Sequence, residues 1–331
     1  MESMSRARPS RRLVLGAVTV LGALAVSAAG LLPAGARAQG LPKVTIAMSG
    51  WTGFAPLTLA KEAGIFKKNG VEVEIKKMPS ANRHQAMAAG EVQAIATTVD
   101  THMMYASSGV AVSQVLVLDS SHGGDGIAVR GDIKDVAGLK GRAVAVESGG
   151  VSQFWLAYVL KKNGLSIADV NQTNLSPKDA AAAFVAGQFD VALTYEPYLS
   201  NVRNANGTIL VTSDQTPGVI IDTLAFQPDY IQKNPTVVQA IVDGWFEALD
   251  MIKADPKKAF EIMGADVKQT PEQFADSARF VKWYDKPGNQ TYLTDTMPGF
   301  LKDVRDVMLE AKLIRRAPDS LDGMSTPAFV K

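Results

Sequence analysis

Short apolar β segments alternate with amphipathic helical segments over much of this chain, and this alternation constrains its fold more than any other feature. Residues 44–48 form one β segment, and the polar stretch 49–53 separates it from a helical segment at 56–63. Residues 71–75 alternate apolar and acidic side chains, which is typical of a half-buried strand. Because the same order recurs from 126 to 193, we predict an α/β fold with parallel-rich sheets flanked by helices.

The first 38 residues have the three-part pattern of a cleaved export signal. A basic start that includes Arg11 and Arg12 precedes an apolar run at 13–32, and small residues surround the expected cleavage point after Ala38. Ser10 and the two arginines also fit a twin-arginine signal, whereas an ordinary secretory signal is the open alternative. We expect cleavage of residues 1–38 and a periplasmic protein.

The composition excludes several classes of site and partner. The chain has no cysteine, which excludes disulfides, thiolate metal sites, a cysteine nucleophile and a lipid-modified cysteine anchor. The formal net charge is +1, and arginines of the signal account for the basic excess, so we expect no nucleic-acid partner. No histidine or acidic motif has metal-ligand spacing, and no phosphate-binding loop is present. We therefore expect neither a metal nor a cofactor.

Six short segments occur in an order that resembles a known family. They are 51–71 (WTGFAPLTLAKEAGIFKKNGV), 88–94 (AAGEVQA), 119–127 (DSSHGGDGI), 139–142 (LKGR), 187–192 (GQFDVA) and 196–198 (EPY). Together they are similar to the solute-binding proteins of the nitrate, sulfonate, taurine and bicarbonate ABC importers, a family that also includes binders of thiamine precursors. The resemblance spans about residues 43–290.

This resemblance implies a two-lobed, type II periplasmic binding protein fold with two crossover strands and a ligand cleft between the lobes. Residues 39–122 and 223–331 should form lobe 1, which includes a helical C-terminal region, and residues 123–222 should form lobe 2. The implied partners are a small-molecule ligand and an ABC permease of the inner membrane with its ATPase.

We expect a monomer and no enzyme. The same resemblance includes a pyrimidine synthase, which relies on a cysteine-rich segment that this chain lacks. An adaptor that docks on a sensor instead of a permease is a further alternative, which the sequence does not separate from transport.

Candidate ligand contacts come from the ends of the predicted strands. Ligands of open α/β sheets bind beyond the carboxyl ends of the strands. The candidates for ligand binding are Trp51, Thr52, Asp100, Asp119, Ser120, Glu147, Ser148, Ser152, Tyr195, Glu196 and Asp222.

Several of these candidates also have a purely structural interpretation. Asp100, Ser148 and Ser152 could cap the helices that they precede. Glu196 could hold its loop instead of touching ligand. Asp125, near an expected crossover, is favoured as a structural hydrogen-bonding residue over a ligand contact.

The turn at 147–152 raises the question of ligand charge. A helix start favours an anion, yet Glu147 places a carboxylate at the same point. Either Glu147 lies against its own helix start, or the ligand carries a positive or N–H-donating group. The candidate contacts include several carboxylates and no Arg or Lys, which favours the second interpretation. We expect a small nitrogen-containing solute that is urea- or guanidine-like, an amine or a zwitterion. The alternatives are a sulfonate or nitrate-type anion and a pyrimidine precursor.

Overall fold

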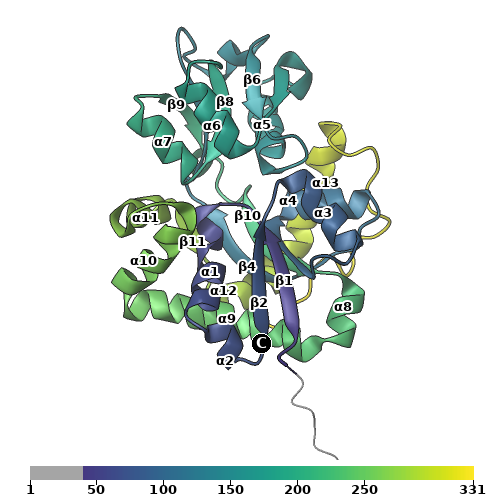
Figure 1. Cartoon of the computed structure of the whole chain (residues 1–331). Coiled ribbons are helices and arrows are strands. Elements are labelled where there is room, and N and C mark those ends of the chain that lie inside the picture. Colours follow the sequence, from purple (N-terminus) through teal and green to yellow (C-terminus); the bar gives the residue numbers. More distant parts are fainter. Residues whose placement is uncertain (1–39) are drawn as a thin grey trace, which may run out of the picture. The chain divides into compact units, whose positions relative to one another are not determined.

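Two mixed β-sheets, each flanked by helices, make up residues 40–331, the part of the chain that this computed structural model describes (Figure 1). Residues 41–331 pack as one unit. The expected export signal at 1–38, with its twin-arginine pattern and its cleavage point, lies outside the described residues. Within 40–331, no helix has both the length and the apolar character needed to cross a membrane.

The first sheet has the strand order β11-β4-β10-β3-β1-β2. Strand β1 is parallel to β2 and β3, whereas β10 runs antiparallel between β3 and β4. Its strands are β1 (Lys43–Met48), β2 (Glu72–Lys77), β3 (Ala94–Thr98), β4 (Ser113–Ser121), β10 (Ile221–Phe226) and β11 (Val281–Trp283).

The second sheet has the order β7-β6-β8-β5-β9. Strand β6 is parallel to β7 and β8, and β5 is antiparallel to β8 and β9. Its strands are β5 (Asp125–Val129), β6 (Ala143–Val146), β7 (Asn171–Asn174), β8 (Val191–Tyr195) and β9 (Thr208–Thr212). The strands β10 and β11 run opposite to the rest of the first sheet, and β5 runs opposite to the rest of the second, so both sheets are mixed. The chain passes from the first sheet to the second between β4 and β5 and returns between β9 and β10.

Helices cover both sheets, and the second sheet carries α5, α6 and α7 (Figure 1). Each helix from α8 to α13 has a proline in its first turn, where the missing N–H costs nothing. Pro256, Pro271, Pro287 and Pro298 therefore each mark the start of a helix. The helices are α1 (Ala55–Glu62), α2 (Ile65–Lys68), α3 (Ser80–Ala88), α4 (Val99–Ser107), α5 (Val151–Lys162), α6 (Pro177–Val185), α7 (Tyr198–Asn204), α8 (Pro228–Lys233), α9 (Pro235–Ala254), α10 (Pro256–Val267), α11 (Pro271–Ala278), α12 (Lys286–Thr291) and α13 (Met297–Glu310).

Short helical turns complete the chain path, and separate apolar cores support the two sheets. The 3-10 turns are η1 (Thr52–Phe54), η2 (Val136–Leu139), η3 (Ile167–Asp169) and η4 (Ser213–Gln215), and η5 (Tyr292–Thr296) is a π-helical turn between α12 and α13. Trp245 and Phe274 are fully buried in the core of the first sheet, and Trp155 lies in that of the second.

The segments between the sheets fall close to the expected lobe boundaries. Residues 122–124 link β4 to β5, and residues 213–220 link β9 to β10. Hydrogen bonds fasten these links to each other, because Gly123 N–H donates to Ser213 Oγ (2.9 Å). The division into lobes at 122/123 and 222/223 stays a prediction, and its second boundary would fall inside β10, which begins at Ile221.

Candidate functional site

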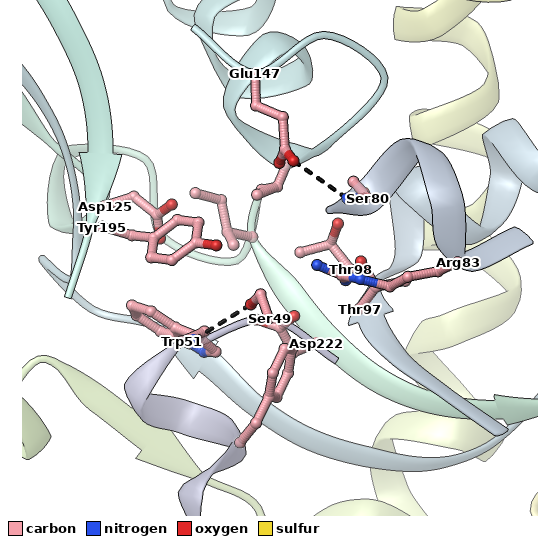
Figure 2. Close-up of a pocket in the computed structure, with 13 residues that line it drawn as sticks. Ser49, Trp51, Ser80, Arg83, Thr97, Thr98, Asp125, Glu147, Tyr195 and Asp222 are labelled. Carbon is pink, nitrogen blue, oxygen red and sulfur yellow. Dashed lines mark hydrogen bonds between the residues drawn. The ribbon is translucent and has the colours of Figure 1, made fainter. Parts of the chain in front are cut away.

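A small cavity of about 20 Å³ lies where residues of both sheets meet (Figure 2). A space of this size holds about one water molecule. The lining combines hydroxyls, carboxyls, one guanidinium and aromatic rings. Its residues are Ser49, Trp51, Phe54, Ser80, Arg83, Thr97, Thr98, Asp125, Glu147, Val151, Tyr195, Ile220 and Asp222.

Strand ends bring these side chains together. Ser49 follows β1, Thr98 ends β3, Tyr195 ends β8 and Glu147 follows β6. Asp222 lies near the start of β10, which runs opposite to β3 and therefore begins where β3 ends. The cavity is thus at the carboxyl ends of the parallel strands, where the sequence predicts a ligand site.

Arg83 is the buried cation of the cavity. It lies on α3, is 3% exposed, and its guanidinium reaches into the cavity beside Thr97 and Thr98 (Figure 2). Its Nε donates to the Met78 carbonyl (3.1 Å) and its Nη1 to the Ala96 carbonyl (3.2 Å). Among residues 40–331, no carboxylate lies within 4.0 Å of this guanidinium. A buried guanidinium without an acidic partner is suited to binding an anionic group.

The expectation that the cleft lacks Arg and Lys is therefore wrong. It considered only the residues that directly follow strands, whereas Arg83 lies in the first turn of a helix. That turn begins three residues after β2, at the same edge of the sheet, so a long side chain reaches the cavity. The sequence feature that could have indicated this residue is an arginine four residues after Pro79, on a helix that starts shortly after a strand ends.

Glu147 forms a hydrogen bond with a helix that lies beside the other sheet. The backbone N–H of Ser80, the first residue of α3, donates to Glu147 Oε1 (3.1 Å, Figure 2). Gly150, the residue that precedes α5, has no side-chain cap. Glu147 also lies against its own helix start, since a Cβ placed on Gly150 would lie 2.9 Å from Glu147 Oε2, although it makes no cap hydrogen bond there. Both sequence interpretations of Glu147 therefore stay predictions.

Buried carboxyl groups surround the cavity. Asp119 and Asp222 are cross-strand partners on β4 and β10. Burial raises the pKa of Asp119 to about 8, while the Trp51 indole N–H, which donates to Asp119 Oδ1 (2.9 Å), lowers it. Burial also raises the pKa of Asp222, and the neighbouring Asp119 raises it further. Asp125, which lines the cavity, has its pKa raised by burial to about 7.

Four of the sequence candidates line the cavity: Trp51, Glu147, Tyr195 and Asp222. The Trp51 and Tyr195 rings meet edge to face with centroids 5.7 Å apart, so they join the two sheets at the cavity wall. Trp51 also donates its backbone N–H to Ser49 Oγ (3.2 Å), which fixes the loop after β1.

The structure does not bring the other seven candidates to the cavity lining. Glu196 is fully buried, is paired with Arg203, and accepts from the Ser200 N–H (3.2 Å) and the Ser277 hydroxyl (3.3 Å). Its interpretation as a residue that holds a loop fits these contacts. Thr52 donates its N–H to the Glu196 carbonyl (3.3 Å).

The remaining five have local roles or lie just outside the lining. Asp100 accepts from the Thr101 hydroxyl (3.2 Å), and burial raises its pKa to about 7. Asp119 lies behind Trp51, and Ser148 donates its N–H to Asn174 Oδ1 (2.9 Å). Ser120 and Ser152 are buried outside the cavity lining.

The sequence candidates missed nine lining residues. Ser49, Thr97 and Thr98 stand at the carboxyl ends of β1 and β3, so the strand-end rule could have found them. Asp125 begins β5, and the sequence favoured a structural role for it. The other missed residues either lie at helix starts or are apolar, and a search for polar side chains at strand ends overlooks both kinds. They are Phe54, Ser80, Arg83, Val151 and Ile220.

An outer pocket of about 460 Å³ continues from the inner cavity. Ser49, Arg83, Glu147 and Tyr195 line both spaces, so they separate the inner cavity from the outer pocket. The outer pocket adds three lysines, of which Lys77 pairs with Asp266 (2.8 Å). Its full lining is Ser49, Gly50, Lys77, Met78, Pro79, Arg83, Glu147, Ser176, Pro177, Lys178, Tyr195, Tyr198, Asp266, Val267 and Lys268. Basic side chains around this pocket favour the approach of an anion.

The donor set of the cavity does not suggest a metal. Over the described part of the chain, no three His, Asp or Glu side chains are arranged to hold a metal ion. The site offers a guanidinium, hydroxyls, backbone N–H groups and carboxyls, which together suit a small polar molecule with oppositely charged parts.

A family model and several known proteins match this chain. The model of the NMT1-like family matches residues 37–265. The taurine-binding periplasmic protein of Escherichia coli (strain K12) is 29% identical over 76% of this chain and 79% of its own length. A putative aliphatic sulfonates-binding protein of the same organism is 31% identical over 41% of this chain and 43% of its own length.

A solved structure shows the same fold. The alkanesulfonate-binding protein from Xanthomonas axonopodis pv. citri, bound to MOPS, has a TM-score of 0.76 at 17% identity and covers 87% of this chain and 99% of its own. The predicted periplasmic binding protein fold is thereby confirmed.

Proposed function

Since the chain belongs to the NMT1-like family, we propose that it is the substrate-binding component of an ABC importer and that it binds a small sulfonate, with an amine-bearing sulfonate such as taurine favoured. The observation that carries the ligand class is the buried guanidinium of Arg83 in the cavity. Its remaining donors, with the Ser80 N–H and the Thr97 and Thr98 hydroxyls, suit the three oxygens of a sulfonate.

The carboxyls of the cavity support an amine on the same ligand. Asp125 and Asp222 line the cavity together with Arg83, and both are buried. An ammonium group offers three N–H donors to such acceptors. A zwitterion therefore satisfies both halves of the lining, whereas a guanidine or urea would leave Arg83 without an anion. This keeps the amine or zwitterion expected from the sequence and disfavours the urea- and guanidine-like solutes.

We also propose the cellular setting. Removal of residues 1–38 would release the protein into the periplasm, where its partners would be the ligand and a permease with its ATPase. The periplasmic names of the relatives support this location. A permease gene beside this one would favour import over the alternative of a sensor adaptor.

Calorimetric titration with taurine, ethanesulfonate, nitrate, urea and guanidine tests the ligand class. We expect taurine and ethanesulfonate to bind, and Arg83→Gln to weaken both at least 10-fold because a charge-assisted hydrogen bond to a buried anion contributes about 1.5–3 kcal/mol. Asp222→Asn should weaken taurine and leave ethanesulfonate unchanged within about twofold.

Arg142→Gln is the matched control, because Arg142 pairs with Asp132 (2.9 Å) at an exposed position. It should leave both affinities unchanged. Thermal melting of Arg83→Gln must show a folded protein, since Arg83 also bonds two backbone carbonyls. Tight binding of guanidine or urea, with no binding of either sulfonate, would refute the proposed ligand.

A further inference from the structure

Glu147 links the two sheets through one hydrogen bond inside the cavity. It follows β6 of the second sheet, whereas its partner Ser80 begins α3 beside the first sheet. Both residues are buried, with 8% and 3% of their surfaces exposed. The carboxylate thus takes a backbone donor that faces the proposed ligand site.

The start of α3 is built to hold an anion, and a second group there points to a ligand. The nine-residue helix directs its first N–H groups and the positive end of its dipole at the cavity. Tyr105 fixes this end, because its hydroxyl donates to the Ser80 carbonyl (2.9 Å). Arg83, one turn further along, is buried, reaches into the same cavity and has no carboxylate within 4.0 Å among residues 40–331.

Glu147 therefore occupies only part of this anion site. It holds the Ser80 N–H and leaves the guanidinium of Arg83 without an acidic partner. A sulfonate has enough oxygens to take both donors together. Both Glu147 and Arg83 line the cavity, so a sulfonate oxygen that accepts from the Ser80 N–H would take the position that Glu147 Oε1 now holds.

We propose that Glu147 is an internal competitor of the ligand: its carboxylate occupies the donor position at the start of α3 that the ligand's acidic group must take. The inference rests on the proposed function. It makes Glu147 a specificity-determining residue, because only a ligand that binds Ser80 and Arg83 together gains enough to displace it. A neutral solute that could accept only the Ser80 N–H would not displace the Glu147 carboxylate.

Calorimetric titration of Glu147→Gln and Glu147→Ala with ethanesulfonate and taurine tests the competition. Removal of a competing charged acceptor should tighten both ligands, by about 5–10-fold in Glu147→Gln and at least as much in Glu147→Ala. The use of both ligands separates competition from a direct contact, because ethanesulfonate has no amine for Glu147 to accept.

Glu310→Gln is the matched control. Glu310 on α13 pairs with Lys161 on α5, so it also joins elements that flank different sheets, but the pair is exposed and outside the cavity. It should leave both affinities within about twofold of wild type.

The outcomes separate the competition from the proposed function. Unchanged affinities in both Glu147 variants would overturn the competition, and so would weaker taurine binding with unchanged ethanesulfonate binding, which would make Glu147 an acceptor of the ligand amine. A folded wild-type protein that binds neither sulfonate would instead refute the proposed function.

Discussion

At the scale of single residues, the cavity and its surroundings hold more acidic groups than the one guanidinium of Arg83 could neutralise. Asp119, Asp125 and Asp222 are all buried near the cavity, and burial raises the pKa of each. The carboxyl pair Asp119 and Asp222 cannot ionise fully without placing two like charges on neighbouring strands. The folded protein therefore favours protonated carboxyls near neutral pH. An incoming ammonium group could replace the protons on these carboxyls as their positively charged partner.

This arrangement predicts a stability that falls as pH rises. The pKa of Asp119 is 3.8 in the unfolded chain and about 8 in the folded protein, so the folded state binds more protons between these values. The favourable contribution of protonated Asp119 is complete below pH 3.8 and is lost progressively as pH rises towards 8. The free energy of unfolding of Asp119→Asn, relative to that of wild type, should therefore increase by about 1 kcal/mol per pH unit between pH 5 and 7.

Urea denaturation of both proteins at pH 5, 6 and 7 measures this difference. Asp135→Asn, at an exposed carboxyl that accepts from the Gly138 N–H (3.0 Å), is the control for the change from Asp to Asn itself. A constant difference between Asp119→Asn and wild type over this range would show that Asp119 is ionised in the folded protein.

Prediction from the sequence was most successful at the element scale. The alternation of short β segments and helices gave the α/β fold because burial imposes a period on apolar residues. In the structure, a proline lies in the first turn of each C-terminal helix for a local steric reason. The strand-end rule found Trp51, Glu147 and Tyr195, since the carboxyl ends of parallel strands converge at one edge of a sheet. Asp222 was found instead from the expected crossover, and it lies near the start of the antiparallel strand β10. The strand-end rule missed Arg83 because the reach of a side chain from a helix depends on how that helix packs.

Tertiary contacts between elements were also hidden from the sequence, as Asn289 on α12 shows. Its side-chain amide accepts from the Val117 N–H (2.6 Å) and donates to the Val117 carbonyl (2.9 Å), which continues the pairing of β4 beyond β11. Asn289→Ala would leave both buried backbone groups of Val117 without these partners. We expect a loss of about 2–4 kcal/mol in the free energy of unfolding.

Urea denaturation measures this loss, and Asn171→Ala is the control. Asn171 is exposed and makes one side-chain hydrogen bond to the Gly141 carbonyl (2.9 Å), so its replacement should cost less than about 1 kcal/mol. Equal losses in the two variants would show that Asn289 does not tie α12 to β4.

Ligand entry is a question for the molecule as a whole. The inner cavity holds about one water, whereas the outer pocket is much larger, and Glu147 and Arg83 line both. A ligand can reach the inner cavity only if residues from the two sheets separate there. The links at 122–124 and 213–220 are the natural hinges for this movement. Binding would then shift the population between open and closed arrangements.

A disulfide across the cavity tests this requirement, and the absence of cysteine from the chain provides a clean background. A Cβ placed on Gly150 would lie 3.2 Å from the Cβ of Ser80, slightly closer than the separation of about 3.5–4.5 Å that a disulfide needs, and 2.9 Å from Glu147 Oε2, so the flexible Glu147 side chain must shift to admit it. The double variant Ser80→Cys, Gly150→Cys should therefore form a bond that holds the sheets together in its oxidised form. We expect the oxidised protein to bind taurine at least 100-fold more slowly than the reduced protein, because closed lobes exclude the ligand.

Stopped-flow fluorescence of Trp51 and its neighbours would measure both rates, with each single variant as a control for the local substitution. Small-angle scattering should show a radius of gyration that falls on ligand binding in the reduced protein and stays constant in the oxidised one. Equal association rates in the two forms would show that the ligand reaches its site without separation of the two sheets.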